Sequence, residues 1–162
     1  MLRTARRMCL FAAIGSALIA PTAAAADTTT IVLYAENRGV ARVDTNAPGT
    51  DHGDLVHREF ALSRTRGGPV IGVAYSQSVI VSYNSDAKID VRRVDTQTVL
   101  PGGTLAATGL SDLAIGTVPQ PGWKDTYAVI GGTGKFAGAR GTEQLTLLED
   151  GRTFKTVITL TK

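Results

Sequence analysis

The sequence predicts an all-β domain of about eight antiparallel strands. From residue 28 onward, short apolar and threonine-rich runs alternate with Gly, Pro, Asn and Asp, and apolar residues at helical spacing are nearly absent. The clearest signal lies near the C-terminus, where two such runs flank Asp150-Gly151. That dipeptide is typical of a type I′ hairpin turn, because it supplies positive φ at little cost.

The first half of the domain contains three expected strands. Residues 30–37 form the first, and a loop at 44–53 with Pro48-Gly49 at its turn separates it from the second at 55–63. Gly67-Gly68-Pro69 ends the second run, because proline donates no hydrogen bond to a ladder. Residues 70–83 then form a long run rich in residues that favour strands.

The second half contains shorter runs, separated by a turn at 84–87, a hairpin at Pro101-Gly102-Gly103 and a loop at 119–122. The expected strands are residues 88–94, 96–100, 104–110, 126–131, 142–148 and 153–160. This spacing fits both a sandwich and a closed barrel. A barrel removes the exposed edges that so many β-rich runs would leave, and eight strands enclose room for one small ligand.

The first 26 residues are expected to be a cleaved signal peptide, so that the domain spans residues 27–162. Three arginines, an apolar stretch over residues 8–20 and three alanines before Asp27 follow the signal-peptide pattern. We therefore expect export, to a periplasm or to the medium, by either the Sec or the Tat route. Cys9, the only cysteine, would leave with this segment, and its place at the start of the apolar stretch argues against a lipoprotein anchor.

The charge balance argues against a nucleic-acid partner. The whole chain has 17 basic and 14 acidic residues, but three of the arginines lie in residues 1–26, so the domain carries 14 charges of each sign. Nucleic-acid binding requires a basic face, which this composition does not supply. The aromatic residues of the domain are scattered singly, unlike the girdles of an outer-membrane barrel, so we expect a protein that is not embedded in a membrane.

Residues 132–137 (GTGKFA) match the dinucleotide-binding fingerprint, but that site requires a helix directly after the motif. Here Gly138 and Gly141 follow and then a β-rich run, so the motif predicts a tight turn between strands.

The sequence gives little support for a metal site or for the catalytic triad of a hydrolase. The segment from Asp44 resembles a calcium loop, yet Pro48 and Leu55 occupy ligand positions, so a plain turn is favoured. His52 and His57 with nearby acids supply at most two ligands on one face, fewer than zinc requires. No serine has nucleophile-elbow spacing. We expect no metal and no cofactor.

Two stretches resemble known families. Residues 125–141 (DTYAVIGGTGKFAGARG) are similar to the "VVGGTGKF…ARG" pattern of dirigent proteins and to the corresponding segment of allene oxide cyclases. Residues 53–56 (GDLV) followed by 71–73 (IGV) are similar to the "GDLV…GIT" stretch of allene oxide cyclases. The resemblance implies a lipocalin-like, eight-stranded antiparallel β-barrel with an apolar lumen. It also implies cofactor-free chemistry, either cyclisation of an unsaturated epoxide or steering of phenoxy-radical coupling.

The resemblance assigns three candidate ligand-binding residues. Asn37 matches the asparagine of the cyclases' Tyr-Glu-x-Asn run, whereas Ala35 takes the glutamate position and Glu36 falls on the opposite face. Ser78 aligns with a cysteine of the long third strand, and Arg140 matches the arginine of the dirigent motif. Asn37 and Ser78 are expected to hydrogen-bond the ligand, and Arg140 to stabilise negative charge or orient an oxygen. We find no counterpart of the acidic residues that dirigent proteins place in the lumen.

The expected function is that of an exported barrel that binds a small, mostly apolar organic ligand and guides its isomerisation, cyclisation or stereoselective coupling. The alternative is a non-catalytic carrier, and an interaction module is the third hypothesis. Ionisable side chains in the lumen would favour catalysis, because general acid–base chemistry needs a titratable group, whereas a lumen of aliphatic, serine and threonine side chains would favour carriage. The sequence leaves homo-oligomerisation open.

Overall fold

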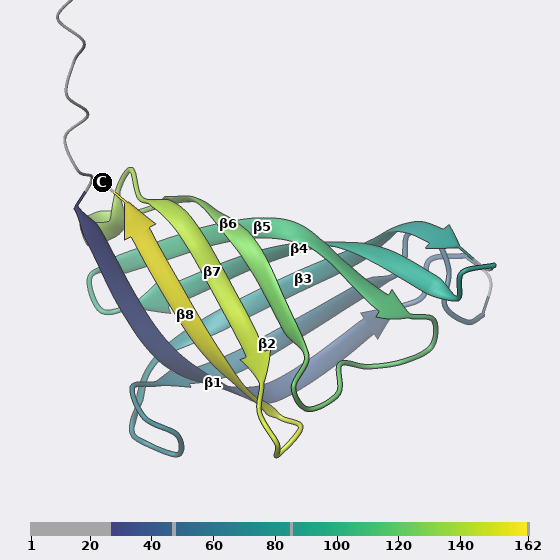
Figure 1. Ribbon diagram of the computed structural model, residues 1–162, viewed down its shortest axis with the longest axis horizontal. Coiled ribbons are helices and arrows are strands. Elements are labelled where there is room, and N and C mark those ends of the chain that lie inside the picture. Colours follow the sequence, from purple (N-terminus) through teal and green to yellow (C-terminus); the bar gives the residue numbers. More distant parts are fainter. Residues whose placement is uncertain (1–26, 47, 85, 162) are drawn as a thin grey trace, which may run out of the picture.

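Eight antiparallel strands close into a barrel in the computed structural model, which describes residues 27–46, 48–84 and 86–161 (Figure 1). The expected signal peptide, residues 1–26, lies outside the described residues. Within the described ranges, no helix is long and apolar enough to cross a membrane.

The strands follow the predicted runs and extend most of them. They are β1 (Thr28–Val43), β2 (Leu55–Ser63), β3 (Val70–Asn84), β4 (Ile89–Leu100), β5 (Gly103–Ala114), β6 (Lys124–Gly132), β7 (Arg140–Leu147) and β8 (Thr153–Thr161). The runs expected at 88–94 and 96–100 form one strand, because Asp95 between them stays in register with both neighbours. β1 continues beyond its expected end through a register shift between Asn37 and Gly39.

Each strand pairs with the next along the chain, and β8 returns to pair with β1. That closing ladder runs from Thr28 opposite Thr161 to Glu36 opposite Thr153. With this ladder, every strand has a hydrogen-bonded neighbour on both sides, so the sheet has no edge strand. The barrel, rather than the sandwich that the strand spacing also allowed, is therefore confirmed.

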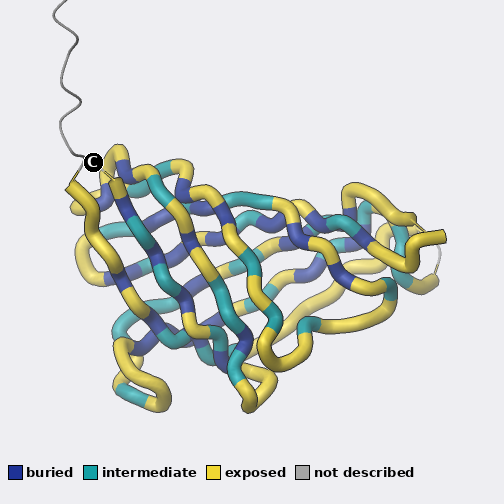
Figure 2. Tube along the Cα trace, in the orientation of Figure 1, coloured by how far each residue is buried: buried dark blue, intermediate teal, exposed yellow. Residues whose placement is uncertain are grey.

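Along much of each ladder, alternate side chains face one shared lumen. In β4 the buried residues are Asp90, Arg92, Val94, Thr96, Thr98 and Leu100, and every residue between them is more exposed. Figure 2 shows this alternation along the strands of the barrel. Because a strand repeats every two residues, every second side chain enters the lumen wherever the ladder is regular, and register shifts such as that at Asn37 change the phase.

Apolar side chains fill the end of the barrel where β4 meets β5 and β8 ends. Ile31, Leu100, Leu105, Phe136 and Leu160 are all buried there in one cluster, which we call the apolar plug. Their burial removes a large apolar area from water, which is the main favourable contribution to folding. None of these five side chains is polar, so this end of the barrel forms an ordinary apolar core.

The glycine-rich segment at 132–141 forms the lid of the apolar plug. A single 3₁₀ turn, η1 (Gly134–Phe136), inserts the Phe136 ring into the plug. The Lys135 amide donates to the Gly102 carbonyl at 2.8 Å, which ties the turn to the β4–β5 hairpin. β7 follows without a helix, so the prediction of a strand-to-strand turn is confirmed and a dinucleotide site is not formed.

The last hairpin is confirmed, but its predicted turn type is wrong. A type I′ turn needs positive φ at both central residues, whereas Gly151 has φ +66° and Asp150 does not have positive φ. The Gly151 amide donates instead to the Leu148 carbonyl at 3.0 Å, which makes Glu149 and Asp150 the central residues. Asp150 Oδ1 accepts from the amides of Arg152 and Thr153, and these side-chain contacts stabilise the longer turn.

Gly141→Ala is expected to destabilise the barrel by at least about 2 kcal/mol. Gly141 has φ +149°, and a Cβ there would lie 1.9 Å from the Thr159 carbonyl oxygen on β8. Gly39→Ala is the matched control, because a Cβ at Gly39 meets nothing within 4 Å. Urea unfolding of both variants measures the difference, and an equal effect of the two substitutions would contradict the close approach of β7 to β8.

Candidate functional site

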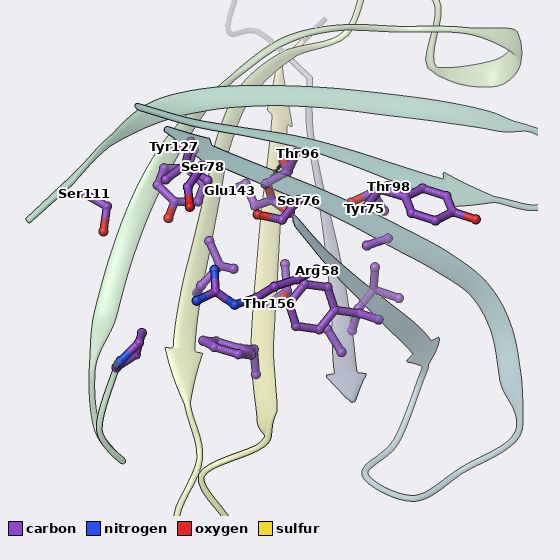
Figure 3. A pocket seen from close by; sticks show the side chains of 18 of the residues that line it. Arg58, Tyr75, Ser76, Ser78, Thr96, Thr98, Ser111, Tyr127, Glu143 and Thr156 are labelled. Carbon is purple, nitrogen blue, oxygen red and sulfur yellow. Dashed lines mark hydrogen bonds between the residues drawn. The ribbon is translucent and has the colours of Figure 1, made fainter. Parts of the chain in front are cut away.

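Beyond the apolar plug, all eight strands contribute to an internal cavity of about 70 Å³, which we call the chamber. Its polar lining consists mainly of Arg58, Ser76, Ser78, Arg92, Thr96, Thr98, Ser111, Tyr127, Glu143 and Thr156. Figure 3 shows these side chains, Arg92 apart, converging from different strands. Few protein cores gather two arginines and a glutamate, because burying charged groups is costly without compensation.

Aromatic rings form the apolar part of the chamber wall. The rings of Phe60 and Phe154 pack edge to face with centroids 5.7 Å apart, and Trp123 packs on Phe154 at 6.2 Å in the same manner. Trp123 and Pro119 belong to the loop between β5 and β6 rather than to a strand. The chamber therefore offers flat apolar surfaces on one side and hydrogen-bonding groups on the other, as small-molecule sites do.

Glu143 is a buried carboxyl group held across the lumen. The Thr96 hydroxyl donates to Glu143 Oε2 at 2.7 Å, and because β4 and β7 are not neighbours, this bond spans the barrel. Burial raises the pKa of Glu143, and the hydroxyl groups of Thr96 and Thr98 only partly oppose that shift. A carboxyl group with a raised pKa keeps its proton to a higher pH than an ordinary glutamate, which suits it to general acid–base chemistry.

Tyr127 lies directly opposite Glu143 in the β6–β7 ladder, on the same side of the sheet. Its hydroxyl donates to Asp125 Oδ2 at 3.1 Å. Burial raises the pKa of Tyr127, and the nearby Asp125 carboxylate raises it further. Tyr127 therefore stays a neutral hydrogen-bonding group beside Glu143.

Arg92 enters the chamber as one half of a buried ion pair. Its Nε and one terminal nitrogen donate to the two Oδ atoms of Asp90, each at 2.7 Å. Asp90 is fully buried and Arg92 is 7 % exposed. A bidentate pair of this kind fixes the orientation of the guanidinium group, because both of its bonds are charge-assisted.

Arg58 is the second guanidinium group of the chamber, and it has no such partner. It is half-buried, and no acidic side chain in the described part of the chain lies within ion-pair distance of it. Burial lowers the pKa of Arg58, and repulsion from Arg92 and Arg42 lowers it further. Of the two arginines that line the chamber, Arg92 is therefore paired with a carboxylate, that of Asp90, and Arg58 is paired with none among the described residues.

Ser78, predicted from the sequence as a ligand-binding residue, lines the chamber. It is 3 % exposed, and its Oγ has no hydrogen-bond partner among the described residues. An unpaired buried hydroxyl costs about 1–3 kcal/mol, so it needs an explanation in a folded protein.

Asn37 and Arg140, the other two predicted binding residues, lie away from Ser78. Asn37 sits at the register shift of β1, its backbone amide donates to the Arg152 carbonyl at 3.1 Å, and it is not part of the chamber lining. Arg140 is exposed at the start of β7, where its side chain donates to the Ala139 carbonyl at 2.8 Å. The structure therefore brings only Ser78 into the chamber, and a ligand role for Asn37 and Arg140 stays a prediction.

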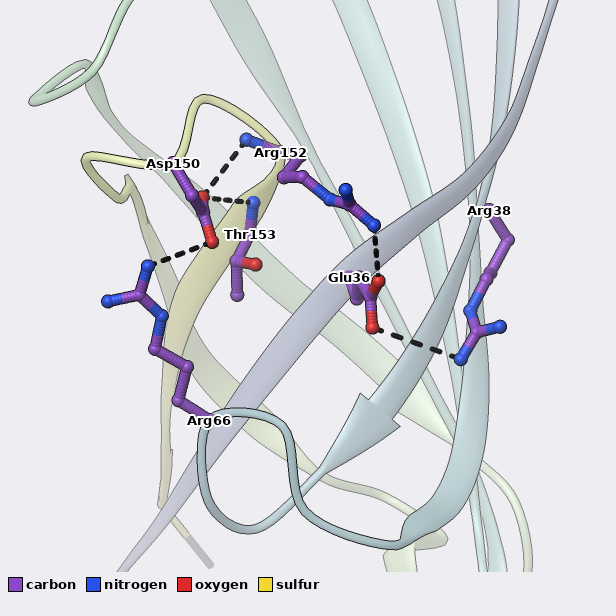
Figure 4. A network of polar contacts seen from close by, with 6 residues as sticks. All are labelled: Glu36, Arg38, Arg66, Asp150, Arg152 and Thr153. Atoms are coloured by element: carbon purple, nitrogen blue, oxygen red, sulfur yellow. Dashed lines mark hydrogen bonds and ion pairs between the residues drawn. The ribbon is translucent and has the colours of Figure 1, made fainter.

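Ala35 and Glu36 lie as the strand period predicts. Ala35 lines the chamber, and Glu36 lies on the outside, where it contacts Arg152 at 2.7 Å and Arg38 at 3.8 Å (Figure 4). The displaced glutamate thus belongs to a surface network rather than to the lumen.

The loop at 44–54 is held by its own acidic side chains. Asp54 accepts from the backbone amides of Asp51 and Thr45, and these bonds lower the pKa of Asp54. Asp44 accepts from the Gly49 amide, and His52 Nε2 lies 2.7 Å from the Val81 carbonyl. Among the described residues no three His, Cys, Asp or Glu side chains gather in a group that could hold a metal ion.

No acidic residue that faces the lumen was identified from the sequence, whereas in the structure Glu143 faces it. It alternates with Leu145 and Leu147 in β7, and this period-two pattern was the available signal for an inward position. Arg58 alternates in the same way with Val56 and Phe60 in β2. Neither could be separated from a surface charge by composition alone.

No protein-family model matches the sequence, and no curated protein is significantly similar to it. Solved structures do match the fold. A pyocyanin demethylase superposes with a TM-score of 0.66 at 23% identity, covering 82% of this chain and 99% of the other. A pterocarpan synthase dirigent protein gives a TM-score of 0.59 at 18% identity, covering 88% of this chain and 94% of the other.

A Diels-Alderase from Streptomyces koyangensis gives a TM-score of 0.63 at 15% identity, covering 86% of this chain and 70% of the other. The chain therefore shares its barrel fold with a dirigent protein and with a Diels-Alderase. At these identities the similarity establishes the fold alone, which agrees with the barrel that the sequence resemblance implied.

Asp90→Asn is expected to cost about 3–5 kcal/mol of stability, because it leaves the buried Arg92 guanidinium without a counter-charge. Asp95→Asn is a matched control on the same strand, since the Arg93–Asp95 pair at 3.2 Å is exposed. The control is expected to cost at most about 1 kcal/mol. Chemical denaturation of both variants checks the pair, and a cost below that of the control would contradict a buried Arg92.

Proposed function

We propose that the protein binds a small, mostly apolar organic ligand in the chamber and guides its isomerisation, cyclisation or stereoselective coupling. The observation that carries this proposal is Glu143, a buried carboxyl group with a raised pKa that faces the chamber. A carrier needs no such group, whereas an isomerase or cyclase can use it to protonate one ligand atom and deprotonate another.

The chamber offers each element that such a reaction requires. Phe60, Trp123 and Phe154 hold a flat apolar ligand in one orientation, and restriction to one reactive conformer lowers the entropic part of the barrier. Ser78 Oγ supplies a free hydrogen-bonding group that fixes a polar atom of the ligand. Tyr127, neutral and opposite Glu143, limits the solvent around the carboxyl group.

The size of the chamber restricts the ligand. A volume of about 70 Å³ is below the 300–1,000 Å³ of typical small-molecule pockets, so the ligand is slender or its entry displaces lining side chains. Pro119 is suited to such a displacement, because it lies in the loop between β5 and β6. The backbone of Trp123 is held, since the Leu147 amide on β7 donates to the Trp123 carbonyl at 2.9 Å, so only its side chain can move aside.

The structural neighbours and the sequence resemblance support the same class of chemistry. The neighbours' names describe a demethylase, a dirigent protein and a Diels-Alderase, and each refers to a reaction of an organic molecule. The proposal includes export directed by residues 1–26, which would make the protein act outside the cytoplasm.

The test is incubation of the purified protein with a small-molecule extract of its host, followed by native mass spectrometry of the protein and chromatography of the extract. We expect a compound to be converted to an isomer of equal mass or to a coupled product. Glu143→Gln is expected to lower turnover at least about a hundredfold, the usual contribution of general acid–base catalysis.

Ser78→Ala separates binding from chemistry in the same assay. It is expected to weaken retention of the compound about tenfold while leaving the folded protein as stable or more stable, since an unpaired hydroxyl is removed. A compound that is retained but never changed, by the native protein and by both variants, would contradict catalysis and favour the carrier.

A further inference from the structure

We propose that the ligand carries an anionic oxygen group, such as a carboxylate, and that Arg58 and Ser78 bind this group inside the chamber. This inference rests on the proposed ligand-binding function and names the class of ligand.

Of the two arginines that line the chamber, Arg58 has no ion-pair partner among the described residues. Asp90 is held by Arg92 through both of its oxygens, and it forms no ion pair with Arg58. Glu143 is bound to Thr96 and has a raised pKa, which makes it a poor counter-charge. Arg42 adds a further positive charge near Arg58. An anion that enters beside Arg58 would therefore supply the ion-pair partner that no described carboxylate provides.

The strand register places Ser78 between the two arginines. Ser78 lies opposite Val56 on β2 and Val94 on β4, and both of these residues face the lumen. Arg58 and Arg92 are each two residues from these partners, so they are its diagonal neighbours on either side. Long side chains reach across such a diagonal, and Figure 3 shows the Arg58 guanidinium extending into the chamber, as does Ser78.

Two independent observations thus favour a ligand with an anionic oxygen group. Within the described part of the chain, Arg58 has no acidic partner, and Ser78 Oγ, in a residue that is 3 % exposed, has no hydrogen-bond partner. A carboxylate satisfies both, because its two oxygens accept from a guanidinium fork and from a hydroxyl at once. Arginine is suited to this role, since its planar donors match the geometry of a carboxylate.

The experiment uses benzoate and benzamide, which have nearly the same shape and differ in charge. Trp123, the only tryptophan of the sequence, lines the chamber and reports binding there by its fluorescence. The native protein is expected to bind benzoate at least about tenfold more tightly than benzamide, as a charge-assisted hydrogen bond provides. The titrations are made at low salt, because chloride competes for the same charge.

Arg58→Gln is expected to bring the ratio of the two dissociation constants close to one, whereas Arg58→Lys keeps part of the preference. Arg93→Gln is the matched control. Because Arg93 lies on the outer face of β4, this substitution is expected to leave the ratio of the two dissociation constants unchanged. Without a probe, the melting temperature of Arg58→Gln is expected to equal or exceed that of the native protein, because the substitution removes an unpaired and partly buried charge.

The outcomes separate this inference from the proposed function. Equal binding of both probes by the native protein, or an unchanged preference in Arg58→Gln, would overturn the anion site and leave a neutral-ligand barrel. If neither probe changes Trp123 fluorescence at millimolar concentration, the anion site is overturned, whereas the proposed function is decided separately by the incubation with the host extract.

Discussion

The antiparallel pairing of β1 with β8 converts an eight-stranded sheet into a barrel, and the position of every functional side chain depends on it. In an open sheet, the inward face of each strand would need a second layer to cover it. In a closed one, every second residue enters a common lumen, whatever its polarity. Closure therefore places Arg58, Arg92 and Glu143, which come from three different strands, around one cavity.

The two ends of the lumen differ in polarity, although apolar residues of the same buried cluster, such as Phe60 and Val94, also line the chamber. The apolar plug, closed by Phe136 and the glycine-rich turn, has the composition of an ordinary core. The chamber instead contains a buried ion pair, a half-buried arginine without a partner and an unpaired serine hydroxyl. Such groups lower stability, and proteins usually retain them where they bind or transform a ligand.

The sequence was sufficient for the architecture but only partly for the site. Period-two runs and turn residues predicted the strands, and the glycines at 132–141 predicted the turn that carries Phe136. The turn at Asp150-Gly151 was assigned the wrong type, because the same dipeptide also fits a longer turn in which only Gly151 has positive φ. Ser78 was found through the family resemblance, whereas Glu143 and Arg58 were missed, because a charged residue in an alternating strand faces water as often as a lumen. Only the register of neighbouring strands shows that their side chains meet.

The most direct test of this account is a ¹³C NMR titration of the glutamate side-chain carboxyl carbons, with Glu143→Gln used to assign the Glu143 signal. The account predicts that Glu143 titrates above the ordinary glutamate value of about 4.3, because its carboxyl group is buried in the lumen. It also predicts that benzoate, bound beside it, displaces the titration further upward, because a second negative charge disfavours ionisation. Titration at or below the ordinary value would show that the carboxyl group is solvated and would contradict the chamber on which the proposed function depends.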